Sequence, residues 1–225
     1  MAMDAPTAMP TDAQVLTLAQ WFSPAYPIGA FSYSHGLEAA VEDGLAGGAA
    51  LQDWTWDVLE HGSGRADATL LAAAYLANTP IDLREIDATA RAFAPSRERL
   101  LETDMQGTAF CQITSAVFDE DLTCLSGLTY PVAVGYAAQC CDLPQTLTAQ
   151  MYLHAFASNL VGCAQRLMGL GQTEAQTIIR ALAPLCIKIA HDTKHGDLAT
   201  LSSTAFLADI ASMRHETQYS RIFRT

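Results

Sequence analysis

The chain has 225 residues, of which 50% are hydrophobic and 16% are charged, so it is long enough and apolar enough to fold around one substantial core. Its 24 acidic and 12 basic residues give a formal net charge of −12, which disfavours nucleic acid because phosphate backbones carry the same sign. The composition excludes a mostly disordered chain and a nucleic-acid binder. A basic protein surface or a cation is the better-matched partner.

The first forty residues contain one helical segment and one irregular segment. Residues 1–10 lack the basic region and the apolar run of a signal peptide, so we predict a mobile N-terminal tail. A helix over 12–22 follows, with Thr11 as its N-cap. Residues 23–36, "SPAYPIGAFSYSHG", then combine two prolines, two glycines and three aromatic rings with almost no charge. This composition indicates a loop of fixed conformation whose side chains make specific contacts.

Helical periods continue through the rest of the chain. "LQDWTWDVLEHG" repeats apolar residues at helical spacing, at Leu51, Trp54, Val58 and Leu59. Residues 96–118 place a comparable apolar stripe at Leu100, Leu101, Met105, Phe110 and Ile113. No run alternates over the length of a strand. We therefore predict an all-α, single-domain helical bundle of about eight to ten helices over 1–225, with flexible N- and C-terminal tails.

A long uncharged stretch raises the question of a membrane span. Between Leu122 and Gln165 the only formal charge is Asp142. Prolines and many polar residues interrupt the stretch, so buried helices explain it better than a spanning helix. The six cysteines show no C-x-x-C spacing and most lie in apolar runs, which is typical of a reducing compartment. We expect a cytoplasmic protein that does not bind membranes.

Catalytic motifs are missing from the sequence. It contains no phosphate-binding loop, no dinucleotide fingerprint, no H-E-x-x-H and no G-x-S-x-G. The best metal candidate is "HDTKHGD", where His191 and His195 stand four residues apart beside Asp192. Gly196 ends that pattern and a third ligand is lacking, so exposed histidines at a frayed helix end remain the alternative. We predict a binding protein without a cofactor rather than an enzyme.

Two motifs at opposite ends of the chain resemble one known family. "SPAYPIGAFSYSHGLEAAVEDG" and the closing "SMRHETQYSRIFRT" are similar to the N- and C-terminal signatures of the urease accessory protein family UreF, and "RLMGLGQ" at 166–172 resembles an internal segment of it. Two mild departures are His35, where the family commonly has Gln, and Thr225, where Ser is usual. The resemblance spans essentially the whole chain.

The resemblance implies a fold and a role. Members of the family are all-α, have no enzymatic activity and form dimers. They bind the accessory protein UreD, also called UreH, and that complex recruits UreG, a GTPase that delivers nickel. The assembly activates apo-urease, whose active site needs two nickel ions, and the resemblance implies that the family member couples GTP hydrolysis by UreG to that activation. The expected partners are thus UreD/UreH, UreG, apo-urease and a second copy of the chain. A nickel-binding metallochaperone using His191 and His195 is the alternative.

Several residues of the opening motif are candidates for partner contacts. Tyr26, Phe31 and Tyr33 offer rigid contact area, although the rings could equally pin the loop to the core. His35 lies beside the start of the next helix. Glu38 lies one turn into that helix, where a surface carboxylate either favours the helix dipole or, as the resemblance implies, contacts a partner.

Further candidates lie at the other end of the chain. Arg166 is an isolated cation in a nearly uncharged helix, so it must pair, reach a surface or contact a partner. Residues 214–225 interleave arginines with aromatics, and by resemblance this tail binds UreD and orders on binding. Folding back onto the acidic body is the alternative. The candidates in the tail are Arg214, His215, Glu216, Tyr219, Arg221, Phe223 and Arg224.

Overall fold

Helices make up the regular structure of the chain in the computed structural model, which describes residues 9–118, 122 and 125–225. The α-helices are α1 (Asp12–Trp21), α2 (Leu37–Glu42), α3 (Gly48–His61), α4 (Ser63–Tyr75), α5 (Pro80–Phe93), α6 (Arg97–Val117), α7 (Tyr130–Cys140), α8 (Gln145–Met168), α9 (Gln172–Asp192) and α10 (Phe206–His215). Two short 3₁₀ helices are η1 (Ala30–Ser32) and η2 (Leu198–Thr200). These described ranges contain no strand, so the all-α prediction is confirmed.

The helix starts follow from capping residues in the sequence. Thr11 and Gln14 form a capping box at the start of α1, as the sequence predicted for Thr11. Thr79 caps α5 in the same way, and Pro80 occupies its first turn. The predicted N-terminal tail, residues 1–10, lies outside the described residues except for Met9 and Pro10, which are exposed.

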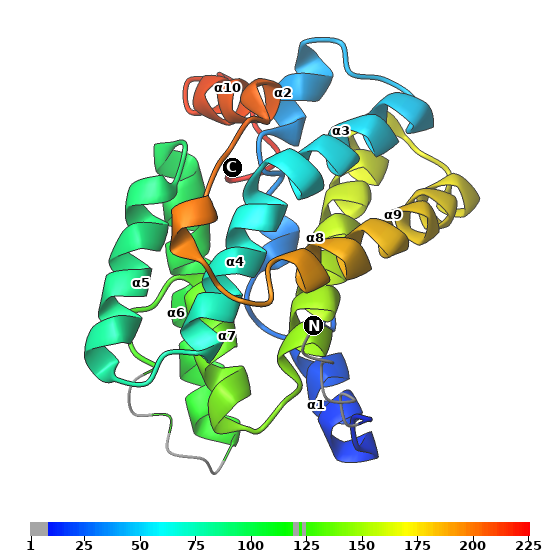
Figure 1. Cartoon of the computed structure of the whole chain (residues 1–225). Helices are drawn as coiled ribbons and strands as arrows, with labels where there is room; N and C mark the ends of the chain where they lie inside the picture. Colours follow the sequence, from blue (N-terminus) through cyan, green and yellow to red (C-terminus); the bar gives the residue numbers. More distant parts are fainter. Residues whose placement is uncertain (1–8, 119–121, 123–124) are drawn as a thin grey trace.

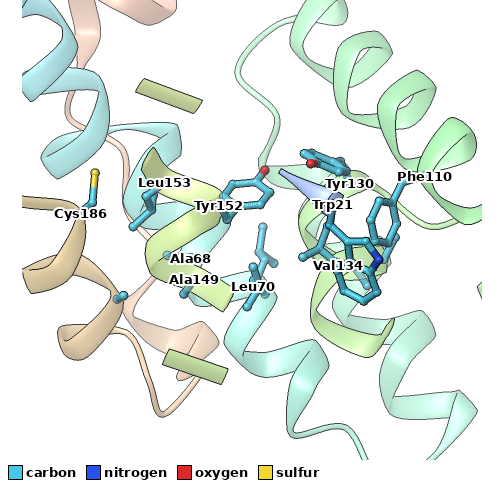
Figure 2. Close-up of a cluster of buried hydrophobic side chains, with 14 of the residues drawn as sticks. Trp21, Ala68, Leu70, Phe110, Tyr130, Val134, Ala149, Tyr152, Leu153 and Cys186 are labelled. Atoms are coloured by element: carbon cyan, nitrogen blue, oxygen red, sulfur yellow. The ribbon is translucent and has the colours of Figure 1, made fainter. Parts of the chain in front are cut away.

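The core lies where α4, α7 and α8 meet in the middle of the molecule (Figure 1). Small residues allow α4 and α7 to approach closely: a Cβ added at Gly135 would lie 2.2 Å from the carbonyl oxygen of Leu71. Aromatic rings fill the space beside these helices (Figure 2). Phe110 contacts both Trp21 and Tyr130 edge-on, at ring-centroid distances of 5.2 and 5.8 Å. One continuous apolar cluster therefore connects α1, α4, α6, α7 and α8.

The helix α6 differs from its predicted pattern. Leu101 and Met105, expected on the apolar stripe, are exposed, whereas Phe110 is buried as predicted. The buried face of α6 also carries charged and polar side chains, namely Glu98, Arg99, Glu102 and Gln106. Burying ionised groups is unfavourable unless each of them is paired. The partners of these side chains therefore show which parts of the chain this face of α6 contacts.

Two remaining expectations concern the apolar segments. Among the described residues no helix is both long and apolar enough to cross a membrane. The five described cysteines form no disulfide, and Cys124 lies outside the described residues.

Candidate interaction site

The irregular loop after α1 has a fixed shape set by its backbone and by one buried ring. Gly29 and Gly36 have positive φ angles of 73° and 77°, and His35, directly before Gly36, has a φ of 58°. Tyr26 is buried and its hydroxyl group lies 2.7 Å from Oγ1 of Thr114 on α6. Phe31 points outward and is 67% exposed. The Tyr26 ring therefore holds the loop against α6, whereas the Phe31 ring is available for contact with another molecule.

Gly36 brings α2 against α10. A Cβ at this position would lie 2.7 Å from the backbone nitrogen of Ser212 in α10, closer than side-chain carbons come to other atoms. The positive φ and the close approach both require glycine here. In Figure 1, α2 and α10 accordingly lie side by side at one end of the molecule, with the C-terminus between them and α6.

The C-terminal segment after α10 folds back onto the loop. The amide nitrogen of Arg224 donates to the carbonyl oxygen of Ser32, and that of Ser34 donates to the carbonyl oxygen of Thr225, both at 2.8 Å. The Ser34 hydroxyl donates to the same Thr225 oxygen at 2.5 Å. Phe223 and Thr225 are buried. The structure thus differs from the expected flexible C-terminal tail, because the body satisfies this segment's hydrogen bonds and buries its phenyl ring.

Glu38 anchors this segment from the first turn of α2. Its carboxylate accepts hydrogen bonds from the backbone nitrogens of Ile222 at 2.7 Å and Phe223 at 2.9 Å. Nε2 of His215 lies 3.3 Å from the same carboxylate. Glu38 is only 6% exposed, so the expected surface carboxylate is instead a buried one with three neighbours from the C-terminal end of the chain. The expectation that it lies on the surface was wrong.

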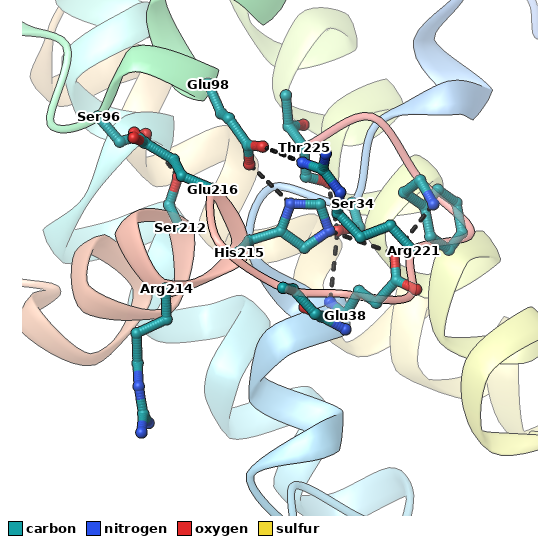
Figure 3. Close-up of polar contacts among 12 residues, drawn as sticks. Ser34, Glu38, Ser96, Glu98, Ser212, Arg214, His215, Glu216, Arg221 and Thr225 are labelled. Atoms are coloured by element: carbon teal, nitrogen blue, oxygen red, sulfur yellow. Dashed lines mark hydrogen bonds and ion pairs between the residues drawn. The ribbon is translucent and has the colours of Figure 1, made fainter.

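His215 bridges two carboxylates from different helices (Figure 3). Its Nδ1 lies 2.7 Å from Glu98 on α6, while Nε2 faces Glu38 on α2. Each ring nitrogen of His215 thus faces a carboxylate oxygen. The Arg221 guanidinium forms an ion pair with Glu98 at 2.8 Å. Glu98 on the buried face of α6 thus finds its partners at the end of α10 and in the C-terminal segment.

A second set of contacts surrounds Glu102. Its carboxylate accepts a hydrogen bond from the Thr225 hydroxyl at 2.9 Å and forms an ion pair with Arg99. His35 lies beside it, with Nε2 at 2.5 Å from the Ser63 hydroxyl. Burial, and then the nearby Arg99 guanidinium, lowers the pKa of His35 well below its ordinary value. His35 is therefore a neutral, buried hydrogen-bonding residue at neutral pH.

Arg166 ties the loop to the C-terminal segment from the outside. Its guanidinium donates to the carbonyl oxygen of Phe31 at 2.9 Å. The same group stacks 4.3 Å from the centroid of the Phe223 ring. Arg166 is exposed, so it both braces these two segments and reaches solvent.

The structure brings together most of the candidate residues but buries several of them. Tyr33, His35, Glu38, His215 and Phe223 are all buried around the C-terminal segment. The other candidates lie at its edge. The exposed Arg214 pairs with Asp43, the half-buried Glu216 accepts a hydrogen bond from the Arg97 amide, and Tyr219 and the side chain of Arg224 face solvent. Sequence reasoning missed the residues that hold the segment from the body, Ser34, Glu98, Arg99 and Glu102.

The two histidines at the end of α9 do not form a site. The helix ends at Asp192, so His195 lies in the following turn and the helical spacing with His191 is not kept. Asp192 is paired with Lys188 and Arg65. In the part of the chain that the structure describes, no group of three or more His, Cys, Asp or Glu side chains could hold a metal ion. Nickel binding at His191 and His195 therefore has no support.

Together, the fold and the site define an all-α protein whose buried polar network serves to hold its own C-terminal segment. A family model for UreF matches residues 45–183 of the chain. The urease accessory protein UreF of Ruegeria pomeroyi is 56% identical over 219 residues, covering 97% of this chain and all of the relative. That of Roseobacter denitrificans is 51% identical over 96% of each chain, and that of Rhodopseudomonas palustris is 42% identical over 98% of this chain and 95% of the relative. The chain belongs to the UreF family of urease accessory proteins.

Proposed function

We propose that this chain is a non-enzymatic adaptor in urease maturation that acts through protein contacts in the cytoplasm. It binds UreD/UreH, forms a homodimer and recruits the GTPase UreG to apo-urease, so that nickel is inserted into the metallocentre. Membership of the UreF family supports the accessory role. Sequence motifs for catalysis are missing, and the buried histidines and carboxylates described above are occupied by contacts within the chain.

The observation that carries the proposal is an exposed apolar surface on α10 and the segment after it. Four residues on α10 leave at least about half of their surface in solvent, Phe206, Leu207, Ile210 and Met213. In the following segment, Ile222 is 71% exposed and Tyr219 is fully exposed. The backbone of this segment is held in place because the amide nitrogens of Ile222 and Phe223 donate to the Glu38 carboxylate. We call these six residues the α10 face. Apolar and aromatic side chains on a fixed backbone are typical of interface anchors.

The α10 face gives the UreD/UreH contact a direct test. Leu207→Asp and Ile222→Asp each place a charge in the contact, so capture of the full-length chain by tagged UreD should fall at least about tenfold. Leu16→Asp is the matched control, because Leu16 is an exposed leucine on α1, at the other end of the molecule (Figure 1). This control should be captured like the native chain.

Two results would contradict the proposal. If both α10-face variants are captured normally while folded by circular dichroism, UreD contacts another surface. If urease activation persists in a strain that lacks this protein, the accessory role itself is wrong.

A further inference from the structure

A pocket of about 670 Å³ opens beneath the irregular loop, between α1, α6 and α8. This volume is in the range of small-molecule sites. Seven phenylalanine, tyrosine and tryptophan rings line it, those of Trp21, Phe22, Tyr26, Phe31, Tyr130, Tyr152 and Phe156. The proposed adaptor function uses the outer surface of the molecule and gives this pocket no role.

Four charged side chains line the pocket, those of Asp67, Arg99, Glu102 and Arg166, and of these only Arg166 is exposed to solvent. Arg99 and Glu102 are buried and form an ion pair, so their charges offset each other. Asp67 on α4 lines the pocket as well, and its carboxylate accepts a hydrogen bond from the Tyr152 hydroxyl at 2.8 Å. Arg99 attracts the Asp67 carboxylate as well, although its ion pair is with Glu102. Two carboxylates of the pocket lining, those of Asp67 and Glu102, thus share the one buried guanidinium group of Arg99.

The titration of Asp67 is consistent with this imbalance. Burial raises the pKa of Asp67 to about 6, although the attraction of Arg99 and the hydrogen bond from Tyr152 act in the opposite direction. A cation placed beside Asp67 would stabilise the ionised carboxylate. The faces of the aromatic rings around it also attract cations, because their π-electrons carry negative charge.

We propose that this pocket binds an organic cation, a primary ammonium or guanidinium group on an aromatic or aliphatic body. The charged group pairs with Asp67, and the body packs against the rings of the wall. An organic anion is the competing ligand, since Nε of Arg99 is buried without a hydrogen-bond partner in the described structure. Such an anion would lie beside the Asp67 carboxylate, which repels it. The site is independent of the proposed adaptor function.

Three ligands of similar shape and different charge separate these cases. The full-length protein is titrated with phenethylammonium, phenylpropionate and phenylethanol by isothermal titration calorimetry at about pH 8, where Asp67 is ionised. We expect phenethylammonium to bind at least about tenfold more tightly than the other two. Its binding should weaken as the pH falls below about 6, because protonation removes the charge of Asp67.

A matched pair of variants assigns the binding to Asp67. Asp67→Asn keeps an oxygen that accepts the Tyr152 hydrogen bond and removes the charge, so it should weaken phenethylammonium binding about tenfold and abolish the pH dependence. Asp53→Asn changes an exposed aspartate on α3 and should have no effect.

Three outcomes would overturn the proposal. Phenylpropionate binding as tightly as phenethylammonium would assign the pocket to anions through Arg99. Equal binding to the native chain and to Asp67→Asn would remove Asp67 from the site. No heat of binding with millimolar phenethylammonium would show that the pocket does not take organic cations, and the ligand series decides this even if Asp67→Asn does not fold.

Discussion

At the scale of single residues, Glu38 is the carboxylate on which the C-terminal segment depends. Replacing it with Gln leaves an amide group facing the two backbone N–H groups of Ile222 and Phe223, and amide nitrogen cannot accept a hydrogen bond. We expect Glu38→Gln to lower the free energy of unfolding by about 2 kcal/mol, because charge-assisted bonds in a buried site are lost. Glu38→Lys should lower it further, since it places a cation beside His215.

Urea denaturation followed by circular dichroism measures this effect, and Glu42→Gln is the control. Glu42 is exposed at the end of the same short helix, so its replacement should change stability by less than about 0.5 kcal/mol. Equal effects at positions 38 and 42 would contradict the anchoring role. The surface position expected from the sequence would instead have allowed charge reversal at Glu38 without a loss of stability.

The candidate residues divide into two groups according to what their side chains can reach. In the proposed function, buried ones such as His35 and His215 act on a partner only by holding the backbone that presents the α10 face. Exposed ones such as Tyr219 can touch the partner directly. A substitution in the first group should therefore change stability and binding together, whereas one in the second should change binding alone.

At the scale of elements, the contact between α2 and α10 depends on the missing side chain of Gly36. Gly36→Ala places a methyl group against the backbone of Ser212, whereas Gly44→Ala, in the turn after α2, meets nothing within 4 Å. Both positions have a positive φ, so the strain of the left-handed conformation is common to both variants. The difference between them isolates the close approach.

We expect Gly36→Ala to be the less stable variant by at least about 2 kcal/mol, and to expose α10 to proteolysis. Thermal unfolding with limited proteolysis measures both. If the two variants unfold at the same temperature, α10 has room to move and the contact is not a constraint on the fold.

Local patterns predicted the helices well but could not predict what the polar residues of α6 contact. The spacing of Leu51, Val58 and Leu59 indicates the buried face of α3. Thr11 predicts the start of α1, because a capping box involves only four consecutive residues. The partners of Glu98 and Glu102 come from the end of the chain, more than a hundred residues away, so no periodicity reveals them. Helix α9 likewise continues through Pro184, where local rules favour a break.

The candidate site shows the same limit. Motif resemblance selected Glu38, His215 and Phe223 one by one, and the structure brings all three into one network. The sequence did not indicate that they would contact one another, because a loop and a tail can be paired only after the helices between them are placed. The arginines and aromatic residues of the C-terminal segment predicted that part of it is exposed for contacts. The sequence did not predict which of its residues are buried against the body.

At the scale of the whole molecule, the C-terminal segment is held against the irregular loop, α2 and α6. Deleting residues 221–225 removes the two backbone donors to Glu38, the Arg221 partner of Glu98, the Thr225 hydroxyl that donates to Glu102, and the buried Phe223 ring. Buried carboxylates are then left with fewer partners, so we expect a loss of about 3 to 5 kcal/mol, which lowers the melting temperature by roughly 10 °C in a chain of this size.

Arg224→Ala is the control for this deletion. The side chain of Arg224 is exposed, and the substitution keeps the backbone hydrogen bond to Ser32, so the melting temperature should stay within about 2 °C of the native value. An unchanged melting temperature after the deletion would mean that the segment is not part of the folded body. The expected loss also changes how partner-binding experiments must be designed: a truncated chain that fails to bind UreD has lost its folded end as well as its contact surface. Substitutions on the α10 face, such as Ile222→Asp, change the contact surface while the buried anchors stay in place, so they separate the two causes.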